Sequence, residues 1–164
     1  MQKLLVFSHL VAIAAFFGAS VFLAVAVDVV GRQAGDAIAR RHRLAELFRV
    51  YNPLSIGALG VVVMTGAWSL TPYKEALRGA YFARVGSLLA GKLALAFLVI
   101  MMATWVSFGI CHRIVRADQG ALPTTDAALR GIVARLRVAL WLTIAVTMVT
   151  LWVALGLRAP AIGA

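Results

Sequence analysis

Two ionisable side chains, His9 and Lys92, interrupt otherwise apolar stretches of the sequence. An ionisable group inside a lipid-spanning segment is costly, so such residues mark candidate functional sites. Each lies six or seven residues into its apolar stretch, and a rise of 1.5 Å per residue places both ~10 Å from that end. Met64 lies six residues before the end of its own apolar stretch, at a similar depth. The three residues therefore form a candidate cofactor site.

The chemistry of these side chains indicates a metal or haem ligand set. Imidazole and thioether groups are both axial ligands of haem iron, and both also bind copper. His9 is thus the candidate metal ligand, with Met64 beside it, and a charged Lys92 suits a haem propionate or another anionic group. Structural alternatives remain for each: His9 bonding a neighbouring helix, Met64 filling the core, and Lys92 extending to the headgroups. His112 lies most of a membrane thickness from His9 and cannot share its metal.

Four long apolar runs carry these residues, at about 3–27, 53–70, 85–110 and 138–157. A helix needs ~20 mostly apolar residues to cross the hydrocarbon core. The runs are continuous rather than alternating, which favours helices over barrel strands. The chain is 63% hydrophobic and 13% charged, well beyond the apolar content of a soluble domain. We therefore predict an all-α integral membrane four-helix bundle that forms a single domain over residues 1–164.

The basic residues predict the orientation of this bundle. Ten of the sixteen lysines and arginines lie in segments 28–52 and 111–137. By the positive-inside rule these segments face the cytoplasm, so both termini lie on the outer side. For a bacterial inner membrane that side is the periplasm. The net charge of +10 then meets anionic headgroups, and no nucleic-acid partner is expected, because the arginines are split between two loops and lack interleaved aromatic residues.

Local signals predict where helices begin. Asn52 and Pro53 are typical of a helix start, which would begin the second helix there. Residues 37–48 would then extend the first helix or lie on the membrane surface. Residues 122–126 predict a turn and a cap for a separate short helix that runs toward Arg137.

The order of these features resembles the four-helix unit shared by HemJ-type protoporphyrinogen oxidases and CopD-type copper-resistance membrane proteins. The matching stretches are FSHLVAIAAFFGASVFL with His9, an Arg-rich loop, NPLSIGALGVVVMTGAW, AGKLALAFLVIMMA with Lys92, and RLRVALW. The resemblance implies a b-type haem with His9 as an axial ligand and Lys92 as a site residue. The aromatic-rich start and mid-helix histidine of HemJ-type proteins are not evident, and His112 lies further along. The resemblance thus favours haem binding over oxidase activity.

Three functions remain open at this point. The first is a membrane redox protein with a b-type haem near the outer leaflet, which transfers electrons or oxidises a porphyrinogen with a quinone or another acceptor. The second is a copper-handling protein using His9 and Met64, against which the lack of Met-rich or His-rich outer loops counts. The third is a non-catalytic accessory subunit that docks onto other membrane subunits or a second copy of itself. No catalytic residue is assigned, and no soluble-enzyme motif is present.

Overall fold

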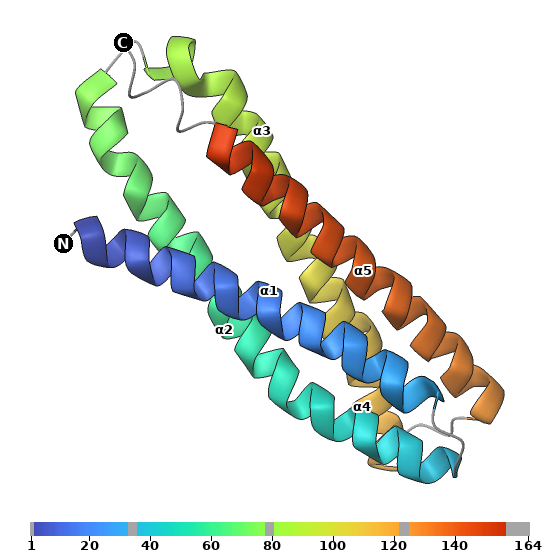
Figure 1. Cartoon of the computed structure of the whole chain (residues 1–164). Helices are drawn as coiled ribbons and strands as arrows, with labels where there is room; N and C mark the ends of the chain where they lie inside the picture. Colours follow the sequence, from blue (N-terminus) through green and yellow to red (C-terminus); the bar gives the residue numbers. More distant parts are fainter. Residues whose placement is uncertain (1, 33–35, 78–80, 122–124, 157–164) are drawn as a thin grey trace.

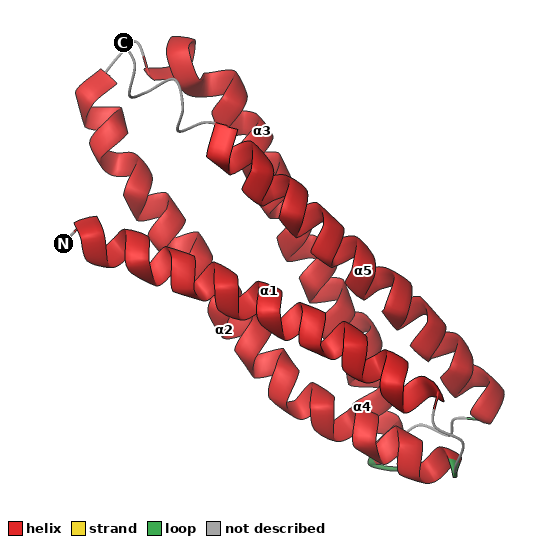
Figure 2. Ribbon diagram, in the orientation of Figure 1, coloured by secondary structure: helices red, strands yellow, loops and turns green. Residues whose placement is uncertain are grey.

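The described part of the chain is built from helices, with no strands (Figure 2). A computed structural model describes all residues except 1, 33–35, 78–80, 122–124 and 157–164, and the side chains of 2, 70, 72–77, 81–85, 87–88 and 155–156 also lie outside it. The elements are α1 (Gln2–Arg32), α2 (Ala37–Leu77), α3 (Tyr81–Thr104), the π-helical segment η2 (Trp105–Cys111), α4 (His112–Asp118) and α5 (Asp126–Gly156).

Four helical stretches are long and apolar enough to cross a membrane: Lys3–Arg32, Ala37–Ser69, Leu89–Asp118 and Asp126–Ala154. The third combines α3, η2 and α4 into one continuous rod. These stretches confirm the predicted all-α architecture with four membrane-length helices. The first residues of α1 and the last turns of α5 lie at the same end of the bundle (Figure 1). The location of both termini outside the membrane stays a prediction.

The predicted start of the second helix at Asn52 and Pro53 is wrong. α2 begins at Ala37 and continues through both residues to Leu77. Proline removes one hydrogen bond, to the carbonyl four residues earlier, and bends a helix; Figure 1 shows α2 changing direction along its length. The turns before Pro53 are held by packing, because Leu44 and Phe48 are 0% exposed. Residues 37–48 therefore belong to the second helix.

The separate short helix before Arg137 is also not observed. α5 runs without a break from Asp126 to Gly156, since no proline interrupts it. The predicted cap is present: the Thr125 hydroxyl accepts a hydrogen bond from the Ala128 backbone N–H at 3.3 Å. Residues 122–124 of the predicted turn lie outside the described residues.

The buried core is concentrated toward one end, which we name the packed end. Its main cluster joins all four membrane-length helices, and a smaller second cluster lies next to it at mid-bundle. The main cluster comprises Leu23, Ala24, Val27, Leu44, Phe48, Tyr51, Val106, Ile110, Cys111, Ile114, Leu129, Leu136, Ala139, Leu140 and Ile144. The second comprises Phe16, Ala58, Val99 and Ala103.

The opposite end of the bundle does not close on itself. None of the described side chains in residues 3–11, 59–69, 89–98 and 148–154 is buried, and we name this region the open end. Toward it, α1 and the second half of α2 separate from α3 and α5 (Figure 1). His9, Met64 and Lys92 all belong to this region, so the candidate site lies where the helices diverge.

Ion pairs between helices add to the packing at the packed end. Arg137 of α5 pairs with Asp28 of α1. Asp118 of α4, whose side chain is 8% exposed, pairs with Arg49 at 3.3 Å and with His42 at 3.2 Å, both from α2. The partners of Asp118 are about half exposed, so each pair contributes modestly to stability. The pairs nevertheless fix which helices are neighbours at this end.

Candidate functional site

His9 lies on the strip of α1 that faces the centre of the bundle. It precedes Phe16 by seven residues and Ser20 by eleven, spacings that return to the same face of a helix. Phe16 is 2% exposed and Ser20 is 1% exposed. His9 itself is half-buried, because the helices separate at its level.

A hydrogen bond to α2 holds the His9 ring. The distance between His9 Nδ1 and Thr65 Oγ1 is 2.8 Å. Thr65 Oγ1 donates to the Val61 carbonyl at 2.6 Å, and a hydroxyl has only one hydrogen to donate. Toward His9 it therefore acts as the acceptor, so Nδ1 carries the proton. In the neutral ring the lone pair is then on Nε2, the atom that a metal would take.

Close helix packing makes this contact possible. A Cβ atom added at Gly66 would lie 3.3 Å from His9 Cε1, which is tighter than ordinary van der Waals contact. The absence of a side chain at Gly66 lets α2 approach the imidazole. Thr65 and Gly66 thus position the ring from α2, one by hydrogen bonding and one by leaving room. The sequence places Thr65 beside Met64 and spaces Gly66 for close helix packing, but it does not identify Thr65 as the partner of His9.

Lys92 also lies on an inward strip, that of α3. It precedes Val99 by seven residues and Ala103 by eleven, and these residues are 6% and 2% exposed. Lys92 is half-buried and has no hydrogen-bond or ion-pair partner in the described part of the chain. A cationic group on the inward side of an apolar helix suits an anionic ligand group. His9 and Lys92 therefore both face the interior of the open end, from α1 and α3.

Met64 does not share this orientation. Its side chain is 60% exposed, and it lies one residue before Thr65, about 100° around α2. Gly57, seven residues earlier on the same face, is also exposed. The structure brings His9 to Thr65 and places Met64 on the outward face of α2. Among the described residues, no three or more His, Cys, Asp or Glu side chains are grouped to hold a metal ion.

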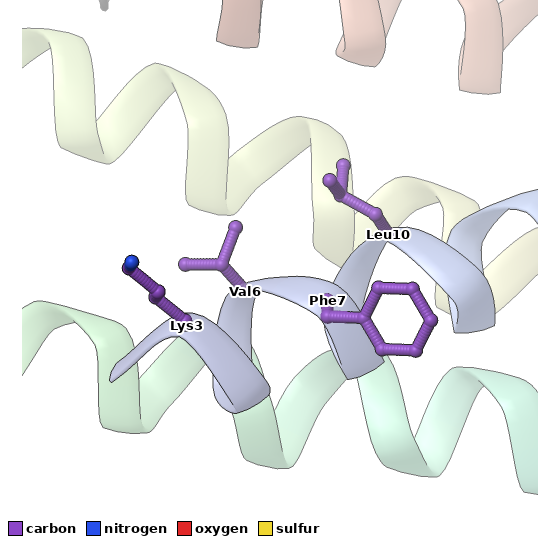
Figure 3. A pocket seen from close by; sticks show the side chains of 4 residues that line it. All are labelled: Lys3, Val6, Phe7 and Leu10. Atoms are coloured by element: carbon purple, nitrogen blue, oxygen red, sulfur yellow. The ribbon is translucent and has the colours of Figure 1, made fainter. Parts of the chain in front are cut away.

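A shallow depression lies on α1 near its first turns. It has a volume of about 440 Å³ and is lined by Lys3, Val6, Phe7 and Leu10. Lys3, Val6 and Leu10 project from the same side of α1 (Figure 3). The lining is almost entirely apolar, with one ammonium group at its terminal edge. The spacing of three and four residues between Lys3, Val6 and Leu10 is the sequence pattern that indicates this face.

The comparisons with known proteins give no family for this chain. No protein-family model, curated protein or solved structure matches it. The HemJ-type and CopD-type resemblance therefore stays an expectation that rests on the short motifs around His9 and Lys92.

Proposed function

We propose that the chain is a membrane redox protein that binds a b-type haem at its open end, with His9 as an axial ligand. The observation that carries this proposal is the His9–Thr65 hydrogen bond. It keeps the Nδ1 proton on the side of α2 and leaves the lone pair of the neutral ring on Nε2. Histidines that ligate metals commonly have such a partner, which fixes the tautomer and the ring orientation.

The residues at the open end suit a haem in two further respects. Its described side chains are predominantly apolar and are not buried against one another, so a flat macrocycle can take the place of missing helix contacts. Lys92 supplies a positive charge on the inward strip of α3, where it can pair with a propionate. The chain thus offers an imidazole, an apolar lining and a cation, the three kinds of contact that a haem makes.

The protein residues would act by binding and orientation. A haem held by these residues would supply one-electron transfer. Thr65 and Gly66 hold the His9 imidazole in place, and the apolar lining keeps water away and lowers the local dielectric. Lys92 neutralises an acidic substituent that would otherwise be costly to bury. An electron partner that dissolves in the bilayer, such as a quinone or a porphyrinogen, would reach this region from the lipid.

The positive-inside rule places the open end on the outer side of a bacterial inner membrane in this proposal. Arg32, Arg40 and Arg41 at the opposite end represent the basic excess that faces the cytoplasm. A fusion of alkaline phosphatase after Ala164 tests the orientation, because this enzyme becomes active only outside the cytoplasm. We expect the fusion to have phosphatase activity. A fusion that inserts in the membrane but is inactive would show that the C-terminus lies in the cytoplasm, which contradicts the proposed orientation.

A second candidate function is that of an accessory subunit that docks into a larger membrane complex. The same open end favours it, because a helix of another subunit would bury the inward strips that this chain leaves unburied. Copper handling by His9 and Met64 has no comparable support, since Met64 is 60% exposed on the outward face. The two remaining functions differ in whether a chromophore is present.

A reduced-minus-oxidised visible spectrum of the protein in mild detergent tests the proposal. We expect a sharp b-type α-band that is lost in His9→Ala while the variant still inserts in the membrane. His112→Ala is the matched control, because His112 is exposed at the opposite end of the third membrane-length helix. This variant should keep the α-band. A featureless spectrum of haem-reconstituted protein, or full haem retention in His9→Ala, would overturn the assignment and favour the accessory function.

A further inference from the structure

A small polar cluster lies inside the packed end, away from the proposed haem site. Ser20 of α1, Tyr51 of α2 and Cys111 of η2 are 1%, 5% and 0% exposed. The hydroxyl oxygens of Ser20 and Tyr51 are 3.4 Å apart, and Tyr51 and Cys111 belong to the same buried cluster. Three helices therefore contribute polar groups to one position in the core. Polar groups in the core of a membrane bundle are costly unless they are paired.

The direction of the hydrogen bonds in this cluster can be worked out. Ser20 Oγ donates its one hydrogen to the Phe16 carbonyl at 2.8 Å. Toward Tyr51 it is therefore an acceptor, and the Tyr51 hydroxyl has one hydrogen to donate, to Ser20 or to Ser55, which also meets it. The Tyr51 oxygen then retains lone pairs, so it is available to accept a hydrogen bond from another group.

Ser107 is the exception among the buried hydroxyl groups. It is 2% exposed, and its Oγ has no hydrogen-bond partner within the described part of the chain. The other buried serine and threonine hydroxyls all donate to backbone carbonyls of their own helices; these are Ser20, Ser55, Thr143 and Thr147. Leaving a buried donor without an acceptor is unfavourable. The Ser107 hydroxyl therefore needs a hydrogen-bond acceptor that the described residues do not provide.

The backbone at Ser107 is also unusual. Residues 105–111 form a π-helical segment, and the His112 backbone N–H bonds to the Ser107 carbonyl, five residues earlier. Such segments are rare and frequently occur at functional sites. Ser107 and Cys111 lie one turn apart on the same side of this segment. Since Cys111 and Tyr51 belong to the same buried cluster, the orphaned hydroxyl belongs to the same region as the polar cluster.

We propose that Ser107 binds an internal water molecule, which links η2 to the Ser20–Tyr51 pair. A water would accept the hydrogen of Ser107 Oγ and has two hydrogens to donate, and we assign the Tyr51 oxygen and the Cys111 sulfur of the same buried cluster as their acceptors. Buried waters typically bond to two to four otherwise unsatisfied groups, as this position would allow. The water would connect the first three membrane-length helices by hydrogen bonds within the main core cluster. This inference is independent of haem binding.

The thermal stability of Ser107→Ala in detergent is the first part of the test. If water is bound, the variant loses the hydrogen bond between Ser107 Oγ and the water. Its melting temperature then falls by about 2–4 °C, the shift that a typical lost hydrogen bond produces in a chain of this size. Thr143→Val is the control: its hydroxyl already donates to the Ala139 carbonyl at 2.8 Å, so a smaller change is expected. An unchanged or higher melting temperature for Ser107→Ala would overturn the proposal, because removing an orphaned hydroxyl from a dry core is not destabilising.

Hydroxyl-radical footprinting is the second part, with radicals generated in place from bound water by X-rays. Tyr51 and Cys111 both react readily with radicals and are buried, so each is modified only if water is adjacent. We expect modification of both in the native protein and a several-fold decrease in Ser107→Ala. Phe48, 0% exposed in the same core, is the dry reference. The proposal requires both results, and labelling no higher than that of Phe48 would refute it whatever the melting temperature.

Discussion

Replacement of Thr65 by valine removes the acceptor of the His9 Nδ1 hydrogen bond and keeps the shape of the side chain. The bond measures 2.8 Å, and the Thr65 hydrogen is already donated within α2, so the substitution removes one contact of the imidazole and little else. Loss of such a supporting contact typically weakens metal binding by about 10- to 100-fold. This corresponds to about 1.4–2.8 kcal/mol in the free energy of haem binding.

The assay is a haem titration of the purified apoprotein in mild detergent, followed by absorbance. Thr65→Ser should bind haem nearly as tightly as the native protein, because it keeps the hydroxyl. Thr150→Val is the matched control, since the Thr150 hydroxyl donates to its own helix in the same way, at 2.7 Å from the Val146 carbonyl, and belongs to α5 rather than α2. Equal dissociation constants for Thr65→Val and Thr65→Ser would refute the argument that Thr65 orients the ligand.

Three further predictions concern haem binding and stability. Met64→Ala should leave the haem spectrum and affinity unchanged, because the side chain is 60% exposed on the outward face; loss of the α-band would show that Met64 is a ligand. Gly109→Ala should lower the free energy of unfolding by about 1–3 kcal/mol, because its Cβ would lie 2.9 Å from the Trp105 ring. Gly60→Ala, whose added Cβ has nothing within 4 Å, should raise the free energy of unfolding by about 1 kcal/mol. Denaturant unfolding measures both variants, and a change of the same sign in Gly109→Ala and Gly60→Ala would contradict this prediction. Pro53→Ala should raise the melting temperature, because it restores a hydrogen bond inside the continuous α2; a decrease would show that the bend is needed for packing.

The four helices of membrane-spanning length followed from the sequence because they depend on local physics. An apolar run can enter lipid only if each backbone group is paired within its own segment, so length and hydropathy are sufficient to predict a helix. The similar depth of His9 and Lys92 likewise followed from counting residues, whereas their inward orientation became evident only from the burial of Phe16 and Val99 on the same helix faces. The helix boundaries were harder: Pro53 looked like a start, but packing of the preceding turns carries α2 through it.

The partners of these residues were decided only by the tertiary structure. Met64 and Thr65 have nearly the same depth along α2, and a rotation of one residue places one outward and the other against His9. Depth follows from counting residues, whereas the face that meets a neighbour depends on how two helices pack. The closure of the bundle at the Arg-rich end and its separation around His9 have the same origin, since both are set by contacts between helices that are distant in the sequence.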